Sequence, residues 1–323
     1  MERQKEAVLI EDSSIAVLIP CYNEAITIGK VVDDFKRIIP QARIYVYDNN
    51  SYDDTGKIAL QHGAIVRSEP RQGKGNVVRQ MFREIDADYY LMIDGDDTYP
   101  AEAALELLIP LIEGRADMTV GDRLSNGTYH DKNNRAFHGF GNNLVRSLIK
   151  ALYGFKYSDV MTGYRGFNKV FAKTFPVLSP SFEIETELSI HAVDKRWKIV
   201  EIPIEYRSRP EGSVSKLRTI PDGIKVLRTI AALFKDYRPL ALFLWIALIF
   251  CIAGLIVGIP VVIEFAQTGL VPRFPSAILA VALIFIGTLS LSSGMILDTL
   301  VKGNRKEYEL QVISAYEKYS KHQ

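Results

Sequence analysis

Short apolar runs alternate with amphipathic stretches through the first 120 residues of the chain. The apolar runs have the length and composition of β-strands and cover residues 15–20, 43–48, 64–69, 89–94 and 117–121. Between them, apolar positions recur with helical spacing at residues 25–38, 54–62, 76–86 and 101–113. This alternation predicts an α/β domain on a mainly parallel sheet with right-handed crossovers. Ligands bind such sheets beyond the carboxyl ends of the strands.

The C-terminal third has a different pattern. Residues 240–263 and 277–297 contain no charged side chain, and both exceed the ~18–20 residues that a helix needs to cross a bilayer. A pair of buried core helices is the alternative, but soluble helices of this length usually keep a polar face. We therefore predict two membrane spans, flanked on their outer sides by Lys225, Arg228, Lys235, Arg238, Lys302, Arg305 and Lys306. By the positive-inside rule, the N-terminal domain faces the cytoplasm, which predicts a multi-pass protein of the inner (plasma) membrane.

Residues 220–238 form a third apolar pattern, directly before the first predicted span. Ile224, Leu227, Ala231 and Phe234 fall on one face of a helix, and basic side chains lie elsewhere around it. This pattern is typical of a helix that lies in the lipid headgroup layer. An ordinary amphipathic helix packed on the domain is the alternative.

Composition narrows the class of protein further. The 39 Lys and Arg residues nearly balance the 38 Asp and Glu residues, so net charge gives no indication of a nucleic-acid partner. Cys21 and Cys251 lie far apart, which argues against a disulfide framework and for a reducing compartment. The first twelve residues are polar and of mixed charge, and we expect no cleavable secretory signal there.

Three carboxylates follow the strand predicted before "DGDD". Asp94, Asp96 and Asp97 stand within four positions, and like charges this close repel one another unless a cation lies among them. Carboxylate oxygens without His or Cys suit Mg²⁺ or Mn²⁺ rather than zinc. Such an ion usually keeps part of its coordination shell for phosphate oxygens. The sequence therefore predicts a Mg²⁺ or Mn²⁺ site at this strand end.

Two further polar motifs stand where ligands of parallel sheets bind. "RQGKGN" (residues 71–76) puts two glycines around Lys74 before a helix, which suits anionic oxygens, although the P-loop spacing is missing and such turns are often only turns. Asp48, Asn49 and Asn50 could bond a base or ribose, or form a helix-capping turn. A nucleotide diphosphate with a divalent ion fits all three motifs together.

These residues carry a family resemblance. The segments that resemble the GT-A domain of family 2 glycosyltransferases are "VLIPCYNE", "YDNNSYDDT", "QGKGN" and "LMIDGDDTYP". Three further segments narrow the resemblance to one group within this family: "DVMTGYRGFNK", "FEIETELSIHAVDKRW" and "YRSRPEGSVSKLRT". They resemble polyprenyl-phosphate glycosyltransferases, the group of dolichyl-phosphate mannose synthase and its bacterial undecaprenyl-phosphate relatives. The resemblance covers roughly residues 14–238 and implies a GT-A (Rossmann-like) domain.

The resemblance implies a role for the residues of the donor site. Those assigned to the nucleotide are Pro20, Tyr22, Glu24, Asp48 (on the base), Lys74 and Asp94. Asp96, with Asp94, is expected to hold the metal that bridges the diphosphate. Asp97 and Asn49 depart from the family's usual residues, which gives Asp97 a lesser role and leaves the base contacts open.

The acceptor site is assigned in the same way. Arg123 and Arg135 fall where relatives present cations to the acceptor phosphate. The residues expected in a loop that closes over the site are Arg207, Arg209, Ser213 and Lys216. Asp159 is expected as the base or the organiser of the acceptor. Glu185 and Glu187 are its rivals, and a plain helix face is the alternative for Glu183 and Glu187.

The function that follows is transfer of one hexose-type sugar from a nucleotide-sugar, a UDP-sugar by analogy, to a polyprenyl phosphate, with inversion. The acceptor phosphate, with a second pKa of about 6, is largely anionic at neutral pH, so positioning and charge neutralisation matter more than a strong base. Alternatives are a processive polysaccharide synthase, whose Q-x-x-R-W is absent because residues 193–197 read "VDKRW", and a non-catalytic membrane scaffold. The product would be a lipid-linked sugar donor for cell-envelope or glycan modification.

Four segments are expected. They are a GT-A domain (1–219), an amphipathic juxtamembrane helix (220–238), a two-helix transmembrane hairpin (239–299) and a cytoplasmic tail (300–323). Related two-span enzymes suggest a homo-oligomer.

Overall fold

The computed structural model describes residues 13–125, 147, 150, 159–212 and 219–320. The chain divides into two compact units, each treated by itself. The first comprises Met1–Ile230 and Gln311–Gln323, and the second comprises Ala231–Leu310.

A seven-stranded sheet forms the centre of the first unit, in the order β3-β2-β1-β4-β6-β5-β7. Its strands are β1 (Ile15–Cys21), β2 (Arg43–Asp48), β3 (Ile65–Ser68), β4 (Tyr89–Met92), β5 (Met118–Asp122), β6 (Arg165–Asn168) and β7 (Ile199–Pro203). Strands β3, β2, β1 and β4 are mutually parallel, as are β5 and β7. Strand β6 alone runs antiparallel, between β4 and β5. The sheet is therefore mainly parallel, as the sequence predicted.

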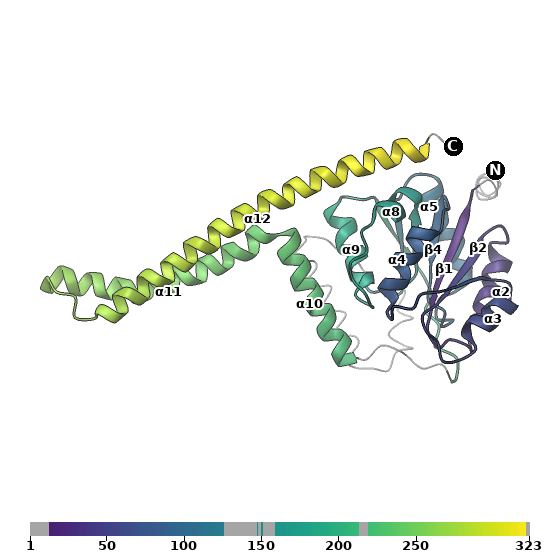
Figure 1. Cartoon of the computed structure of the whole chain (residues 1–323), viewed down its shortest axis with the longest axis horizontal. Coiled ribbons are helices and arrows are strands. Elements are labelled where there is room, and N and C mark those ends of the chain that lie inside the picture. The colour runs from purple at the N-terminus through teal and green to yellow at the C-terminus, as the bar shows by residue number, and fades with distance from the viewer. Residues whose placement is uncertain (1–12, 126–146, 148–149, 151–158, 213–218, 321–323) are drawn as a thin grey trace. The chain divides into compact units, whose positions relative to one another are not determined.

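Helices cover both faces of this sheet (Figure 1). They are α2 (Ile28–Ile38), α3 (Thr55–Gln61), α4 (Lys74–Glu84), η1 (Ala101–Ala103), α5 (Ala104–Ile112), α8 (Lys169–Thr174) and α9 (Ile184–Asp194). Alternate residues of β1 point to opposite faces: Val17 packs with α2 and α5, whereas Leu18 packs with α4, α8 and α9. Because both faces are buried, the central strands are apolar throughout, which is why they stood out in the sequence.

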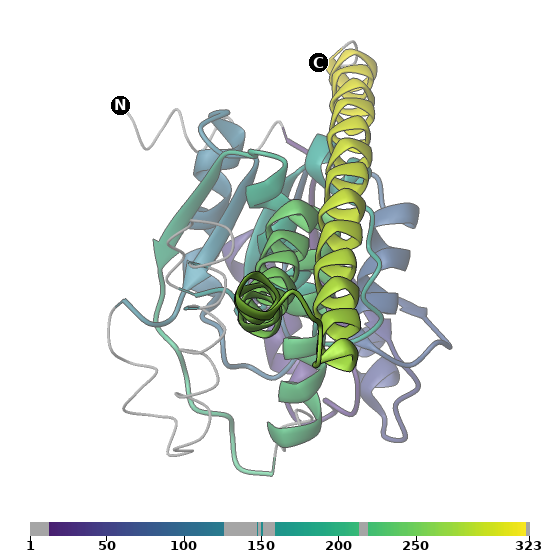
Figure 2. The same ribbon diagram turned by 90° about the vertical axis from the view of Figure 1, so that its left-hand side faces the viewer.

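The second unit is largely a helical hairpin. α10 (Thr219–Tyr237) crosses from one unit to the next in sequence, and α11 (Pro239–Thr268) and α12 (Phe274–Ser320) are long and apolar enough to span a membrane. The two long helices run side by side (Figures 1 and 2). A Cβ on Gly254 would lie 2.7 Å from Ile284 Cγ1, and one on Gly287 would lie 2.7 Å from Cys251 Sγ. Small residues therefore let the helix backbones approach closely.

The predicted strands and helices lie within about three residues of the observed ones. Two strands, β6 and β7, were not predicted. The pattern at residues 220–238 corresponds to α10. Helix α12 continues without a break from the predicted second span to Ser320, so no change of secondary structure marks residues 299–300.

Candidate active site

Polar residues gather where β1, β2 and β4 end. The parallel register pairs Cys21 of β1 with Asp48 of β2, which brings the turns after both strands to one edge of the sheet. Asn23 and Asn50 follow with positive φ angles of 55° and 61°, a conformation that asparagine tolerates. Glu24 is buried in the first turn, and its backbone N–H donates to Thr55 Oγ1 at 2.8 Å. These turns lie at the sheet edge where parallel sheets bind ligands.

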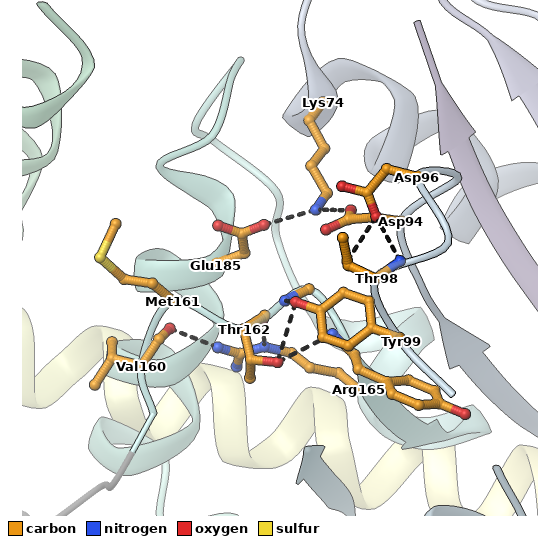
Figure 3. Close-up of polar contacts among 12 residues, drawn as sticks. Lys74, Asp94, Asp96, Thr98, Tyr99, Val160, Met161, Thr162, Arg165 and Glu185 are labelled. Atoms are coloured by element: carbon orange, nitrogen blue, oxygen red, sulfur yellow. Dashed lines mark hydrogen bonds and ion pairs between the residues drawn. The ribbon is translucent and has the colours of Figure 1, made fainter. Parts of the chain in front are cut away.

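The three carboxylates after β4 have different surroundings, and Figure 3 shows two of them, Asp94 and Asp96. Asp96 is buried, its Oδ1 accepts from Thr98 Oγ1 at 2.6 Å, and its other oxygen pairs with Arg209. Burial raises the pKa of Asp96, and neighbouring Asp94 adds to this rise, while Arg209 opposes it. Asp97 adopts a φ of 57° and pairs instead with Lys30 at 2.8 Å. Asp94 and Asp96 thus form the pair that could hold a cation, and Asp97 has a separate partner.

Lys74 connects Asp94 to Glu185 of α9 (Figure 3). Its Nζ donates to Asp94 Oδ1 and, at 2.6 Å, to Glu185 Oε1. Burial alone would lower the pKa of Lys74, but the two carboxylates raise it, so the ammonium stays charged. Burial raises the pKa of Glu185, and Lys74 opposes that rise. Glu185, which the sequence offered as a catalytic alternative, is therefore the ion-pair partner of the glycine-loop lysine.

The glycine loop fits tightly against another backbone segment. Gly73 has a φ of 127°, and a Cβ there would lie 2.2 Å from Pro180 O. A Cβ on Gly75 would lie 1.9 Å from Ser179 O. Only glycine permits this approach at both positions. The segment before α9 is thereby packed directly on the start of α4, which begins with Lys74.

Arg123 and Asp159 form a buried, two-pronged ion pair. Arg123 Nε donates to Asp159 Oδ2 at 2.6 Å, and Nη2 donates to Oδ1 at 3.0 Å. The guanidinium also lies 5.9 Å from the ring centre of Tyr99 and 5.6 Å from that of Tyr206. Both oxygens of Asp159 are therefore engaged by one cation, and the planar guanidinium is held in a fixed orientation.

Two residues of this site were not predicted as functional (Figure 3). The Tyr99 hydroxyl accepts from Gly163 N at 2.9 Å. Arg165 is fully buried, and its guanidinium donates to Thr162 O at 3.0 Å and Val160 O at 2.7 Å. Together they fix the segment that follows Asp159. Both residues stand within the motifs used for the resemblance, but neither has a local pattern that reveals its contacts.

The remaining predicted residues lie as follows. Pro20 is in β1, and Tyr22 packs edge-on against Tyr52 with ring centres 6.2 Å apart. Arg207 Nη2 donates to Glu102 at 2.9 Å, and Arg209 reaches Asp96. Glu187 accepts from the backbone N–H of Ser179 at 2.7 Å. Arg135, Ser213 and Lys216 lie outside the described residues.

The donor set fits a phosphate-bridging ion. Asp94 and Asp96 supply hard oxygen ligands, and Mg²⁺ or Mn²⁺ is commonly held by one or two carboxylates and substrate phosphates. Within the part of the chain that the structure describes, no three His, Cys, Asp or Glu side chains gather as a complete metal cage. Asp94 and Asp96 are thus the described carboxylates that could hold such an ion together with phosphate oxygens.

Comparison with known proteins agrees with this geometry. The family model described as glycosyl transferase family 2 matches residues 16–175. Glycosyltransferase AglJ of Haloferax volcanii is 30% identical over 295 residues, which are 91% of this chain and 96% of AglJ. A dolichyl-phosphate hexose transferase of the same organism is 30% identical over 225 residues, or 69% of this chain and 95% of the relative.

The fold also matches a solved structure. Glucosyl-3-phosphoglycerate synthase from Mycobacterium tuberculosis, crystallised with Mn²⁺, uridine diphosphate and glucosyl-3-phosphoglycerate, superposes with a TM-score of 0.59 and 20% identity. The match covers 71% of this chain and 82% of that synthase. At this identity the likeness concerns the fold. The match to AglJ covers nearly the full length of both chains, and the family model covers the strand-end motifs described above. The chain therefore belongs to glycosyl transferase family 2 and is a glycosyltransferase with the GT-A fold.

Proposed function

We propose that the protein is a membrane-bound, inverting glycosyltransferase that moves one hexose from a nucleotide-sugar, a UDP-sugar by preference, to a polyprenyl phosphate. The observation that carries the proposal is the pairing of acids with cations around the strand ends: Asp94 with Lys74, Asp96 with Arg209, and Asp159 with Arg123. A reaction that brings a diphosphate and a phosphate together needs both kinds of charge. The relative named dolichyl-phosphate hexose transferase supports this acceptor class.

The donor half of the site would use Asp94 and Asp96. These carboxylates would hold Mg²⁺ or Mn²⁺, as the Mn²⁺ and uridine diphosphate in the mycobacterial synthase support. When bound, the ion supplies positive charge against the leaving nucleoside diphosphate. Arg209, which pairs with Asp96 in this structure, would then be available to a phosphate oxygen. Lys74 stays beside Asp94 and adds a fixed positive charge to the diphosphate pocket.

The nucleoside would lie at the ends of β1 and β2. Pro20, Tyr22 and Glu24 come from the first of these strands and its turn, and Asp48 closes the second. The pair Tyr22–Tyr52 offers aromatic surface beside this edge, and Tyr52 is 88% exposed. An aromatic face stacks on a base at little conformational cost.

The acceptor half would use Arg123. A lipid monophosphate is largely a dianion at neutral pH, because its second pKa is about 6, and it needs little help from a base. Its chief requirement is a cation that holds it close to the diphosphate of the donor, which is also negatively charged. Asp159 orients Arg123 for this task, and Arg135, Ser213 and Lys216 are proposed to add contacts from segments beyond the described ones. A single in-line displacement inverts the anomeric carbon.

The membrane part of the proposal concerns α10, α11 and α12. Large apolar side chains on the outer faces of the hairpin are exposed, among them Trp245 at 65% and Ile256 at 68%. Exposure on this scale is unfavourable in water and favourable in lipid. We propose that α11 and α12 span the inner membrane, that α10 lies in the headgroup layer, and that the GT-A domain is cytoplasmic. A homo-oligomer stays a prediction.

A panel of acceptors tests the acceptor class. The purified full chain in detergent receives one radiolabelled UDP-hexose at a time with Mn²⁺, and undecaprenyl phosphate, undecaprenol, a glucan or 3-phosphoglycerate. The expected result is one labelled sugar on undecaprenyl phosphate and none on the alcohol, which has the same chain without the phosphate. Label on the glucan would favour a polysaccharide synthase, and label on 3-phosphoglycerate a soluble acceptor. No transfer from any of the UDP-hexoses to any of the acceptors would contradict the proposed donor and would be the result expected of a non-catalytic scaffold.

A further inference from the structure

Asn49 holds the glycine loop to the sheet. It follows β2 directly and is only 3% exposed. Its side-chain Nδ2 donates to Glu69 O at 2.8 Å and to Arg71 O at 2.9 Å. Its Oδ1 accepts from Gly73 N at 2.6 Å and from Gln72 Nε2 at 3.3 Å. One buried amide thus makes four hydrogen bonds to residues 69–73. We call this set of four hydrogen bonds the clasp.

The clasp needs an amide rather than a carboxylate. Two carbonyl oxygens face Nδ2, and only a donor can satisfy both of them. An ionised aspartate at this position would place oxygen against these two carbonyl oxygens, while the donors Gly73 N and Gln72 Nε2 would still find an acceptor. An unmade bond to a buried carbonyl is costly because no water replaces it. An amide rather than a carboxylate at position 49 therefore has a structural reason in this chain.

The clasp bears on Lys74 through the backbone. Gly73 is the residue that precedes α4, and Lys74 is the first residue of that helix. On its other side the loop packs on Ser179 and Pro180, where a Cβ on Gly75 would lie 1.9 Å from Ser179 O. Asn76 N also donates to Pro180 O at 3.1 Å. Because the loop is held on both sides, the backbone position of Lys74 is fixed.

From this backbone position, Lys74 Nζ contacts Asp94 and Glu185 together. A loop released from Asn49 could shift at Gly73 and Lys74, and the ammonium would no longer be held between both carboxylates. Fixing the loop in advance lowers the entropic cost of binding a diphosphate there.

We propose that Asn49 is a positioning residue of the donor site, and that its amide sets the glycine loop and Lys74 for the nucleotide diphosphate. The effect on nucleotide affinity rests on the proposed function, whereas the effect on the loop does not. Asn49 itself touches neither substrate nor metal in this role. Asn49→Asp, which changes one NH₂ to O⁻, is the most specific test.

The matched control is Gln41→Glu. Gln41 is exposed and lies in the turn before β2, at the other end of that strand from Asn49. The variant makes the same amide-to-carboxylate change away from residues 69–73 and leaves the clasp intact. Asn49→Ala serves as the second variant, because it removes the clasp without burying a charge and stays informative if Asn49→Asp fails to fold.

The experiment combines hydrogen exchange with nucleotide binding on the full chain in detergent. In Asn49→Asp and Asn49→Ala, amides of residues 71–77 should exchange at least about tenfold faster than in wild type, the usual scale for lost buried hydrogen bonds. Amides of α5 should be unchanged, and the affinity for UDP with Mn²⁺ should fall about tenfold or more. Gln41→Glu should stay within about threefold of wild type on both readouts.

The outcomes separate the two proposals. Unchanged exchange at residues 71–77 in the Asn49 variants would overturn the clasp, as would equal effects in Gln41→Glu or a general rise in exchange that includes α5. Faster loop exchange with undiminished UDP affinity would overturn the positioning role. Faster loop exchange in a protein whose wild type binds no UDP would contradict the proposed donor and leave the clasp supported.

Discussion

Arg123 and Asp159 are joined by two nearly parallel hydrogen bonds, Nε to Oδ2 at 2.6 Å and Nη2 to Oδ1 at 3.0 Å. Both side chains are buried, and Asp159 is only 1% exposed. Each carboxylate oxygen thus has a cationic partner, which leaves Asp159 poorly placed to take a proton from a substrate. The pair is better suited to hold the guanidinium in one orientation.

Asp159→Asn distinguishes these two roles. A general base typically contributes ~10²–10⁴-fold, and it would matter most at pH 6, where more of the acceptor phosphate carries a proton. A positioning residue would matter equally at every pH. We expect the same fractional loss of transfer at pH 6 and pH 8.5, each measured against wild type under conditions where chemistry limits the rate. A loss at pH 6 that largely vanishes at pH 8.5 would identify Asp159 as the base.

Lys74→Met should make stability depend on pH. The variant leaves Glu185 buried beside Asp94 without its cation, so the pKa of Glu185, already raised by burial, should rise further. A raised carboxyl pKa favours the protonated folded protein, so stability is kept at low pH and lost as pH rises through that value. Thermal unfolding should show a loss of about 3 kcal/mol relative to wild type at pH 8, and less at pH 5. The double variant Lys74→Met, Glu185→Gln should lose this dependence, and its persistence there would point to another group.

His191 makes the stability of the protein depend on pH in the opposite direction. It lies in α9 with its ring centre 4.9 Å from that of Phe175, and burial lowers its pKa to about 3, with Lys195 adding to the effect. The unfolded chain binds a proton near the ordinary value, so stability falls as pH drops below about 6.5. Between pH 7 and pH 5 this contributes a loss of about 2 kcal/mol, which His191→Gln should remove. Parallel stability curves for variant and wild type would contradict the assignment.

Gly75→Ala tests the contact between the glycine loop and the segment before α9. Because the new methyl group would meet a backbone oxygen, one segment must move, at a cost of about 1–3 kcal/mol. We expect a lower melting temperature together with weaker nucleotide binding. Gly303→Ala is the control, since nothing lies within 4 Å of its Cβ position in α12, and it should be neutral or slightly stabilising. Equal behaviour of the two variants would mean that the loop yields freely.

The sequence was informative wherever chemistry and local pattern coincide. β1, β2 and β4 are apolar runs that end in polar turns, and the same turns carry the candidate ligands. The hairpin was equally legible, because an uncharged stretch longer than a bilayer needs has few alternatives.

Other features could not be read locally. β6 (Arg165–Asn168) contains a fully buried arginine and no apolar run, so neither its strand nor its antiparallel direction has a periodic signal. The contact of Lys74 with Glu185 joins residues 111 positions apart. Tyr99 acts through a hydroxyl bonded to Gly163 N. Each of these depends on how distant segments pack, which no short window of sequence encodes.

The most direct test of the proposed chemistry is the ratio of released nucleotide to glycosylated lipid, measured for wild type and Asp96→Asn with undecaprenyl phosphate, UDP-hexose and Mn²⁺. Wild type should release one nucleoside diphosphate for each lipid that gains one sugar, and a chelator should stop the reaction. Asp96→Asn should remain folded, as judged by an amide hydrogen-exchange pattern like that of wild type. It should lose the metal dependence of nucleotide binding and transfer almost no sugar. Release of a nucleoside monophosphate, several sugars on each lipid, or near-normal turnover of Asp96→Asn in the presence of the chelator would contradict it.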